Sequence, residues 1–212
     1  MKIEKENIYH IYNQGNNRQQ IFFSREHYLL FLKLYRKQIA EQCETLCYCL
    51  MPNHFHFLVY ATDKSIVEMK LGVITIQKLS DGFRRLLSTY AHEINSLRGT
   101  AGSLFRQKTQ AKLIGSGIST TTISYAEQCF YYIHQNPVSA GLAAKNCDWE
   151  FSSAQDFSGI RNGTLCNQQL AFQLFGWESD DLSFLNRSYI VDKEIETSFF
   201  EFKSPSDQGQ TE

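Results

Sequence analysis

The segment MPNHFHFLVY, residues 51–60, is the feature that most restricts the fold of this chain. Successive side chains of a β-strand point to opposite faces, so His54 and His56 share one face while Phe55 and Phe57 share the other. The phenylalanines predict a buried face. The histidines predict either two strand residues packed on a core or two imidazoles close enough to bind one metal ion, and the pair alone leaves both interpretations open.

Local patterns predict the other strands and helices. Runs of β-branched and aromatic residues indicate strands, apolar residues at helical spacing indicate helices, and glycines indicate breaks. Pro137 disfavours a helical conformation at Asn136, so the last helix is expected to end or kink there. The predicted elements are a strand at 8–13, a helix at 25–38 after the N-cap Ser24, strands at 45–51 and 54–61 around a turn at Pro52-Asn53, one or two helices over 65–97 with Gly72 and Gly82 as break points, a strand within 99–115, and a helix over 120–135.

This order of elements predicts an α+β fold of the ferredoxin-like type, a split βαβ antiparallel sheet with helices on one face and one added helix. We expect one domain over residues 1–145 and a C-terminal extension with short helices over 146–203. The last residues, 204–212, are polar and rich in turn formers, which predicts a disordered tail.

Composition restricts the class of protein further. The sequence has no long uncharged apolar run, and its start, MKIEKEN, is not followed by the apolar stretch of a secretory signal, so we expect a cytoplasmic protein with no membrane segment. The cluster Cys43, Cys47 and Cys49 lacks the CxxC spacing of common zinc sites and lies among large apolar residues. This context favours buried free thiols over a structural zinc.

The charges are unevenly distributed along the chain. Residues 1–141 hold 16 Lys and Arg against 10 Asp and Glu, whereas residues 142–212 hold 5 against 12. A basic body suits a polyanionic partner, and an acidic extension either solvates the chain or competes for the basic surface.

The stretch CFYYIHQNPVSAG, residues 129–141, is the second informative motif. Helical positions four apart share a face, so Tyr132 and Asn136 project together near the expected end of the helix. A phenol and an amide oxygen at this spacing suit a nucleophile and a metal ligand. Tyr131 and Gln135 have the same spacing, so geometry alone does not choose between the two pairs.

Together, PNHFHFLVY and YYIHQNPVSAG resemble the single-tyrosine HUH transposases, in particular the REP-associated tyrosine transposases. The resemblance includes IYHIYNQGNNRQQIFF near the start, YAHEIN and GSLFRQKTQAKLI before the tyrosine helix, and CDWEFSS after it. It covers roughly residues 7–155, with the motifs in the family's order. The predicted sheet would then be the HUH palm, and the helix over 120–135 would carry the tyrosine.

The resemblance implies a metal-dependent, single-stranded DNA endonuclease and strand transferase that forms a 5′-phosphotyrosine intermediate on hairpin-containing DNA. Carried over, Tyr132 is the nucleophile, because the family tyrosine directly precedes Ile-His-x-Asn-Pro. His54, His56 and Asn136 are ligands of Mg²⁺ or Mn²⁺, and Gln135 is an alternative third ligand because some relatives carry Gln. Related enzymes include monomers and homodimers, and both states stay open here.

Several polar and basic residues are candidates for DNA contacts. Arg106, Lys108 and Gln110 alternate and are expected to share one strand face. Tyr9 and Tyr12 are candidates for stacking on bases. The candidate contacts to phosphates or bases are Asn16, Asn17, Arg18, Arg84, Arg85, Arg106, Lys108 and Lys112.

Two rival functions remain at this point. A catalytically retired DNA-binding protein would keep the fold without the chemistry, although such a protein would be free to lose His54, His56 and Tyr132. A zinc hydrolase using the two histidines and a cysteine would have a water nucleophile and would not need Tyr132.

Overall fold

The structure is a computed structural model that describes residues 1–116 and 120–177, with side chains described for 1–115 and 125–177. The predicted tail over 204–212 and residues 178–203 of the predicted extension lie outside this range. No helix within the described ranges is long and apolar enough to cross a membrane. The elements are β1 (Asn7–Gln14), η1 (Asn16–Arg18), α1 (Arg25–Gln38), β2 (Cys43–Met51), β3 (His54–Ala61), α2 (Asp63–Ile66), β4 (Glu68–Leu71), β5 (Ile74–Gln77), α3 (Lys78–Arg98), β6 (Gln110–Ser116), α4 (Thr120–Ser139), η2 (Asn146–Asp148), α5 (Ala154–Phe157) and α6 (Gln168–Phe175).

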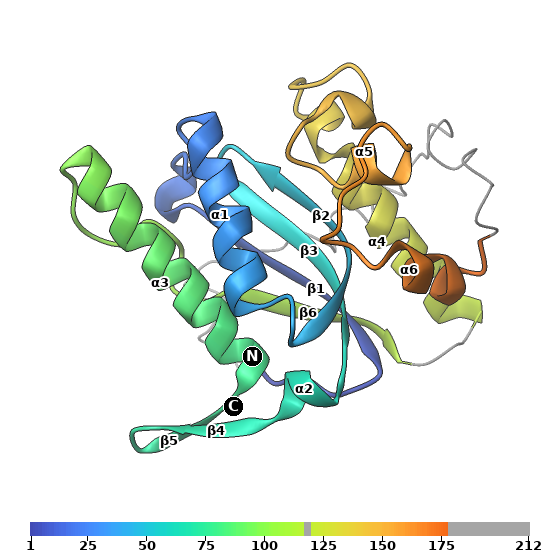
Figure 1. The fold of residues 1–212 in the computed structure, drawn as a ribbon, viewed down its shortest axis with the longest axis horizontal. Helices are drawn as coiled ribbons and strands as arrows, with labels where there is room; N and C mark the ends of the chain where they lie inside the picture. The colour runs from blue at the N-terminus through green and yellow to red at the C-terminus, as the bar shows by residue number, and fades with distance from the viewer. Residues whose placement is uncertain (117–119, 178–212) are drawn as a thin grey trace, which may run out of the picture.

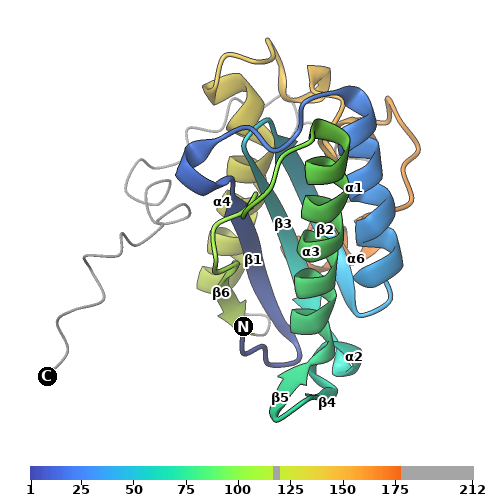
Figure 2. The same cartoon turned by 90° about the vertical axis from the view of Figure 1, so that its left-hand side faces the viewer.

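The four main strands form an antiparallel sheet in the order β2-β3-β1-β6. Both β1 and β2 run antiparallel to β3, which lies between them, so β1-α1-β2 is a split βαβ unit. The predicted ferredoxin-like α+β fold is therefore confirmed. Helices α1 and α3 lie on one face of this sheet and α4 lies on the other, where α6 packs beside it (Figures 1 and 2).

Alternation along the central strand β3 gives the sheet two different faces. Phe57 is fully buried and stacks on Tyr35 of α1 with ring centroids 4.1 Å apart, and it also contacts Phe83 of α3. His56, the residue before Phe57, points to α4 instead. An aromatic core therefore forms between the sheet and α1 and α3, while a polar cluster forms beneath α4.

Residues 65–77 do not form the predicted helix. They leave the short α2 and fold into the β4–β5 hairpin, in which Leu71 pairs with Ile74 across a two-residue turn. Gly72 occupies the first turn position with φ +60°, a conformation that glycine adopts without a Cβ penalty. The run VITI that follows is β-branched, so turn chemistry and strand propensity together override the helical interpretation.

The glycine and proline expected to interrupt helices have other roles. A Cβ at Gly82 would lie 2.6 Å from the Gln38 carbonyl, so Gly82 permits close packing of α3 against α1 within an unbroken helix. The last helix does not end at Asn136, one of the two predicted outcomes, but continues through Pro137 to Ser139. Ala140 N–H donates to the Asn136 carbonyl, and this turn of helix survives the loss of the proline donor.

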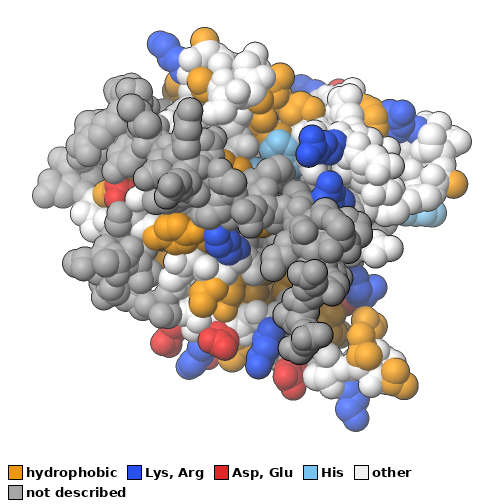
Figure 3. Space-filling model, turned by 180° about the vertical axis from the view of Figure 1, so that it is seen from behind, with side chains coloured by type: hydrophobic (Ala, Val, Ile, Leu, Met, Phe, Trp, Pro, Cys, Tyr) orange, Lys and Arg blue, Asp and Glu red, His pale blue; other side chains and the backbone are white. Residues whose placement is uncertain are grey.

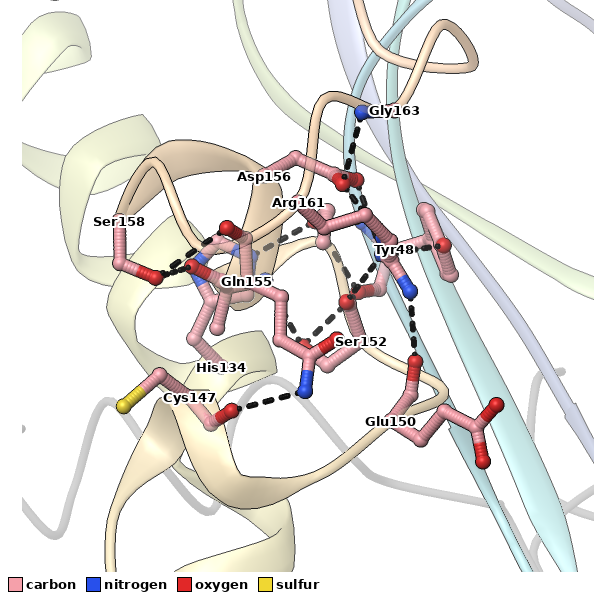
Figure 4. Close-up of polar contacts among 12 residues, drawn as sticks. Tyr48, His134, Cys147, Glu150, Ser152, Gln155, Asp156, Ser158, Arg161 and Gly163 are labelled. Carbon is pink, nitrogen blue, oxygen red and sulfur yellow. Dashed lines mark hydrogen bonds and ion pairs between the residues drawn. The ribbon is translucent and has the colours of Figure 1, made fainter.

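The segment after α4 covers the outer edge of β2. Leu50 and Phe151 form a backbone hydrogen bond, and the Asn167 N–H donates to the Thr45 carbonyl. Arg161 holds the buried carboxylate of Asp156 with an Nε–Oδ1 distance of 2.6 Å and also donates to the Tyr48 hydroxyl (Figure 4). Covering this edge removes its unpaired backbone groups from solvent.

The same segment is bonded to the tyrosine-bearing helix. His134 of α4 lies 2.7 Å from the Ser153 Oγ through its Nε2, and the Tyr48 N–H donates to that same oxygen (Figure 4). His134 therefore packs into the core, away from the histidines of β3. The cysteines Cys43, Cys47 and Cys49 are free and buried, as predicted.

Candidate active site

Two strand histidines and one tyrosine meet between β3 and α4. The ring centroids of His54 and His56 are 4.9 Å apart, and the Tyr132 ring lies edge-on to His56 at 5.5 Å. The strand period places both histidines on the α4 side, and helix α4 brings Tyr132 over them. Two motifs far apart in the sequence thus form one cluster. On one face of the molecule, a histidine side chain lies beside Lys and Arg side chains (Figure 3).

The third member of the cluster is Asn136, one helical turn after Tyr132. Its Nδ2 donates to the Tyr132 carbonyl at 2.8 Å, which turns Oδ1 toward β3. That oxygen lies 3.4 Å from His54 Nε2, and the same amide interacts with His56. Asn136 therefore faces both histidines, and the helical continuation past Pro137 keeps it in place.

His54 is oriented from its other ring nitrogen by Asn53. The Asn53 Nδ2 donates to the Arg18 carbonyl, so its Oδ1 is the atom that lies 2.6 Å from His54 Nδ1. A neutral imidazole has one N–H, and the short contact to Oδ1 places it on Nδ1. His54 Nε2 then presents a lone pair to the Asn136 oxygen, which is also an acceptor. Two acceptors facing each other are the arrangement that a bound cation would stabilise.

His56 is held by a third histidine, His10 of β1. His10 Nε2 and His56 Nδ1 are 2.8 Å apart, and both rings are fully buried. This contact occupies Nδ1 of His56, so Nε2 is the ring nitrogen left to face the site. His10 lies in the N-terminal motif IYHIYN, for which the sequence predicts no metal-site role.

Burial sets the protonation of these rings. It lowers the pKa of His54 to about 4 and the pKa of His10 to about 3, with the positive charge of Lys112 adding to the effect at His10. Burial also lowers the pKa of His56 well below its ordinary value, helped by the neighbouring histidines. The rings are neutral at pH 7, and a neutral imidazole has the lone pair that a metal ligand requires.

The two adjacent tyrosines of α4 lie in different surroundings. Tyr132 contacts His56 and His10, whereas the Tyr131 hydroxyl donates to Glu127 and its ring packs near Trp177. The structure therefore brings Tyr132, and not Tyr131, to the histidine cluster. Gln135, the alternative third ligand, is partly buried on α4, and the amide turned toward His54 is that of Asn136.

The loop before α1 wraps around the turn that begins β3. Gly15 N–H donates to the Asn53 carbonyl. A Cβ on Gly15 would lie 2.0 Å from the Gln19 carbonyl oxygen, so the close approach of Gly15 to Gln19 within this loop requires glycine. Asn16, Asn17 and Arg18 follow as the exposed turn η1. Through Asn53, this predicted DNA-binding loop is joined directly to His54.

The predicted basic contacts divide between the two faces of the sheet. Lys112 pairs with His10 across β1 and β6, lies on the α4 side and approaches the Tyr125 ring. Arg84 and Arg85 are exposed on α3, which covers the opposite face, and Arg84 forms an ion pair with Asp81. Lys108 is exposed before β6, beside a groove of about 420 Å³ that Arg84 and Arg106 also line.

The prediction that three alternating residues share one face of the fourth strand is wrong. Arg106 and Lys108 do not share a face with Gln110, because β6 begins only at Gln110. Four residues separate Phe105 from Gln110, whereas two residues separate their partners on β1, Gly15 and Tyr12. The chain therefore loops out between Phe105 and Gln110. Asn13 Nδ2 donates to the Arg106 carbonyl within that loop.

The two tyrosines proposed for stacking are both buried. The Tyr9 hydroxyl accepts the Glu4 N–H on the α1–α3 side of the sheet, and Tyr12 packs against His10 on the α4 side. Neither ring is presented to a base.

Sequence reasoning missed His10 and Asn53, the two residues that contact the Nδ1 atoms of His56 and His54. The sequence predicts only a turn at Asn53, and the signal for its contact with His54 is the carboxamide directly before the His-x-His pair. The signal for His10 is its place two residues before Tyr12, which pairs with His56. Only the strand register reveals that proximity.

Comparisons with known proteins add a distant likeness. No protein-family model matches the chain, and a search of curated proteins gives no match. Among solved structures, the chain is similar to a REP-associated tyrosine transposase bound to a REP hairpin, with 17% sequence identity and a TM-score of 0.48 over 71% of this chain and 78% of that chain.

Proposed function

We propose that the chain is a metal-dependent, single-stranded DNA endonuclease and strand transferase of the single-tyrosine HUH type. The observation that carries this proposal is the convergence of His54, His56 and the Asn136 oxygen, with the Tyr132 ring against His56. Each of these residues also stands at the matching position of the family's sequence motifs.

The donor set fits a divalent cation. Two neutral imidazoles and an amide oxygen suit Mn²⁺, and Mg²⁺ is the alternative where it is more abundant. The opposed acceptors on His54 and Asn136, 3.4 Å apart, support a cation between them. When bound, such an ion would polarise the scissile phosphate and stabilise the charge that develops there.

Tyr132 supplies the nucleophile. Its hydroxyl loses a proton, its oxygen bonds to phosphorus, and the bond from phosphorus to the 3′ oxygen breaks, leaving a 5′-phosphotyrosine and a free 3′-hydroxyl. A phenol has a reference pKa of about 10, so its anion leaves more readily than an alkoxide and a 3′-hydroxyl can reverse the step. This reversibility makes strand transfer accessible as well as cleavage.

The residues around the cluster support a nucleic-acid substrate. Lys112 lies on the same sheet face as His10, and the exposed turn from Asn16 to Arg18 is joined to His54 through Asn53. Cations and amides at these positions can contact phosphates and bases on either side of the reacting phosphate. Hairpin-containing DNA is the proposed substrate, as the sequence resemblance implies.

The test is covalent capture on a denaturing gel. Purified protein is mixed with Mn²⁺ and a labelled single-stranded pool in which a fixed hairpin is flanked by randomised nucleotides. Wild type should give a slow-migrating protein–DNA band that requires the metal. Tyr132→Phe should give none, because the nucleophilic oxygen is absent.

Tyr131→Phe is the matched control, since it removes the adjacent hydroxyl from the same helix. It should retain the covalent band. Binding of the pool without a band in wild type would favour the retired DNA-binding protein, and cleavage without a band would favour a water nucleophile and a metal hydrolase.

A further inference from the structure

We propose that His10 is a positioning residue that accepts the Nδ1–H of His56 and thereby turns the Nε2 lone pair of His56 toward the metal. The inference rests on the proposed function, because it concerns the same ion. It assigns a role to a residue outside both sequence motifs.

The contact is defined by the sheet. Tyr12 is the direct partner of His56 across β1 and β3, and His10 lies two residues away on the same face. From there His10 Nε2 reaches His56 Nδ1 at 2.8 Å, and the two rings lie within 24° of parallel. Both side chains are fully buried, so solvent does not compete for this hydrogen bond.

The direction of the hydrogen bond decides whether His56 can bind a metal through Nε2. Each neutral ring has one N–H and one lone pair. If His10 donated, the proton of His56 would sit on Nε2 and block that position. If His56 donates from Nδ1, its Nε2 is available. The metal-binding arrangement therefore requires His10 as the acceptor.

The neighbouring histidine has the same arrangement. The Asn53 oxygen accepts at His54 Nδ1, 2.6 Å away, and leaves Nε2 facing Asn136. His54 and His56 are therefore each hydrogen-bonded at Nδ1 by a neighbouring side chain, Asn53 and His10 respectively. Groups that hold a metal-ligating histidine through its second nitrogen fix its tautomer and orientation, and their loss costs roughly 10–100-fold in metal affinity.

The first test reads the proton directly. Protein labelled with ¹⁵N-histidine is saturated with Mg²⁺, which is diamagnetic, and the protonated ring nitrogens are identified by NMR. We expect the proton on His56 Nδ1 and the lone pair on His10 Nε2. A proton on His10 Nε2 with His56 Nδ1 bare would overturn the proposal.

The second test measures Mn²⁺ affinity without DNA, by calorimetry or electron paramagnetic resonance. His10→Phe should bind Mn²⁺ roughly 10–100-fold more weakly, because nothing holds the His56 tautomer. His10→Gln should restore most of the affinity, since its side-chain oxygen can accept the same N–H. His134→Phe is the matched control, because His134 is also fully buried but bonds to Ser153 and not to a ligand; it should bind Mn²⁺ as wild type does.

The outcomes separate this inference from the proposed function. Equal Mn²⁺ affinity in wild type and His10→Phe would refute the role of His10 while leaving the metal site intact. Weak binding in His10→Phe and His134→Phe alike would mean a general packing effect and would also refute it. Normal Mn²⁺ binding, with the expected tautomer but no covalent DNA band, would refute the nuclease and retain the role of His10. Absence of Mn²⁺ binding in wild type would refute both.

Discussion

The two faces of the central sheet differ although the same strand builds both. On the α1–α3 side, Phe57 lies in a dry aromatic core with Tyr35 stacked on it. On the α4 side, His54 and His56 occupy the alternate positions, in a buried polar cluster whose acceptors face one another. The aromatic arrangement stabilises the fold, and the polar arrangement buries acceptor atoms that are able to bind a cation. Side-chain alternation along β3 therefore directs the phenylalanines to the stabilising core and the histidines to the polar cluster.

The largest effect is expected when a ligand is removed from the polar face. His54→Ala should reduce the rate of Mn²⁺-dependent adduct formation at least about a thousandfold, as the loss of a central residue of a catalytic group does. The stability of the fold should change little. Adduct yield on a denaturing gel and urea unfolding measure the two quantities. Undiminished cleavage by this variant would show that the histidine pair is not the metal site.

A comparable change on the other face should affect only folding. Phe57→Ala should destabilise the protein by about 3–5 kcal/mol, because it removes a fully buried ring from a packed core. Urea unfolding followed by tryptophan fluorescence measures the loss. The control is Val73→Ala in the exposed β4–β5 turn, which should leave stability unchanged. A small loss for Phe57→Ala would mean that the aromatic face is not the stabilising one.

Acid should destabilise the fold through its buried histidines. The pKa values of His10, His54 and His134 are lowered from 6.5 to about 3–4 in the fold, so the unfolded chain binds protons that the folded chain does not as pH falls below 6.5. Stability is therefore fully present above pH 6.5 and declines toward pH 4, by up to about 1.4 kcal/mol per pH unit for each such histidine.

Urea unfolding at pH 7.5 and pH 5, at fixed ionic strength, measures this decline. His134→Phe removes a buried histidine outside the cluster of His10, His54 and His56, and it should reduce the dependence of stability on pH without removing it. Equal stability of wild type at the two pH values would contradict the neutral, buried state of these rings.

The smallest effect is expected on DNA affinity, and it tests which face of the sheet the proposed DNA substrate contacts. Lys112→Ala, on the histidine side, should weaken single-stranded DNA binding and reduce the salt dependence of log K by roughly 0.7, the value of one lost phosphate contact. Arg84→Ala, on the α3 side, should change the DNA affinity and its salt dependence much less. Fluorescence anisotropy over a salt series measures them. A larger effect of Arg84→Ala would place the DNA on the opposite face, along the groove beside α3.

Local patterns predict the main sheet and its helices well, since alternation and helical spacing are consequences of side-chain direction. The strand His54–Ala61 and the helix Arg25–Gln38 match their predicted bounds. The β4–β5 hairpin differs from the helix that the sequence predicts for this region, because Gly72 has a positive φ and forms a turn. The end of the helix expected at Asn136 is absent, because α4 continues through Pro137 to Ser139 and the Ala140 N–H donates to the Asn136 carbonyl.

The site shows the same division between local and long-range information. His54, His56, Tyr132 and Asn136 are recognisable because each lies in a motif with defined spacing. Their supports, His10 and Asn53, depend on strand register and on a loop that returns to the turn. Sequence spacing does not contain that information, which is why the cluster of candidate site residues could be predicted and the residues that contact its two histidines could not.

The most direct test of the nuclease mechanism is to locate the covalent bond. The Mn²⁺-dependent adduct is digested with nuclease and protease, and tandem mass spectrometry identifies the residue that carries the nucleotide phosphate. The account predicts a phosphate ester on Tyr132, with Tyr131 unmodified in the same peptide. A nucleotide on Tyr131 or on another residue would contradict it.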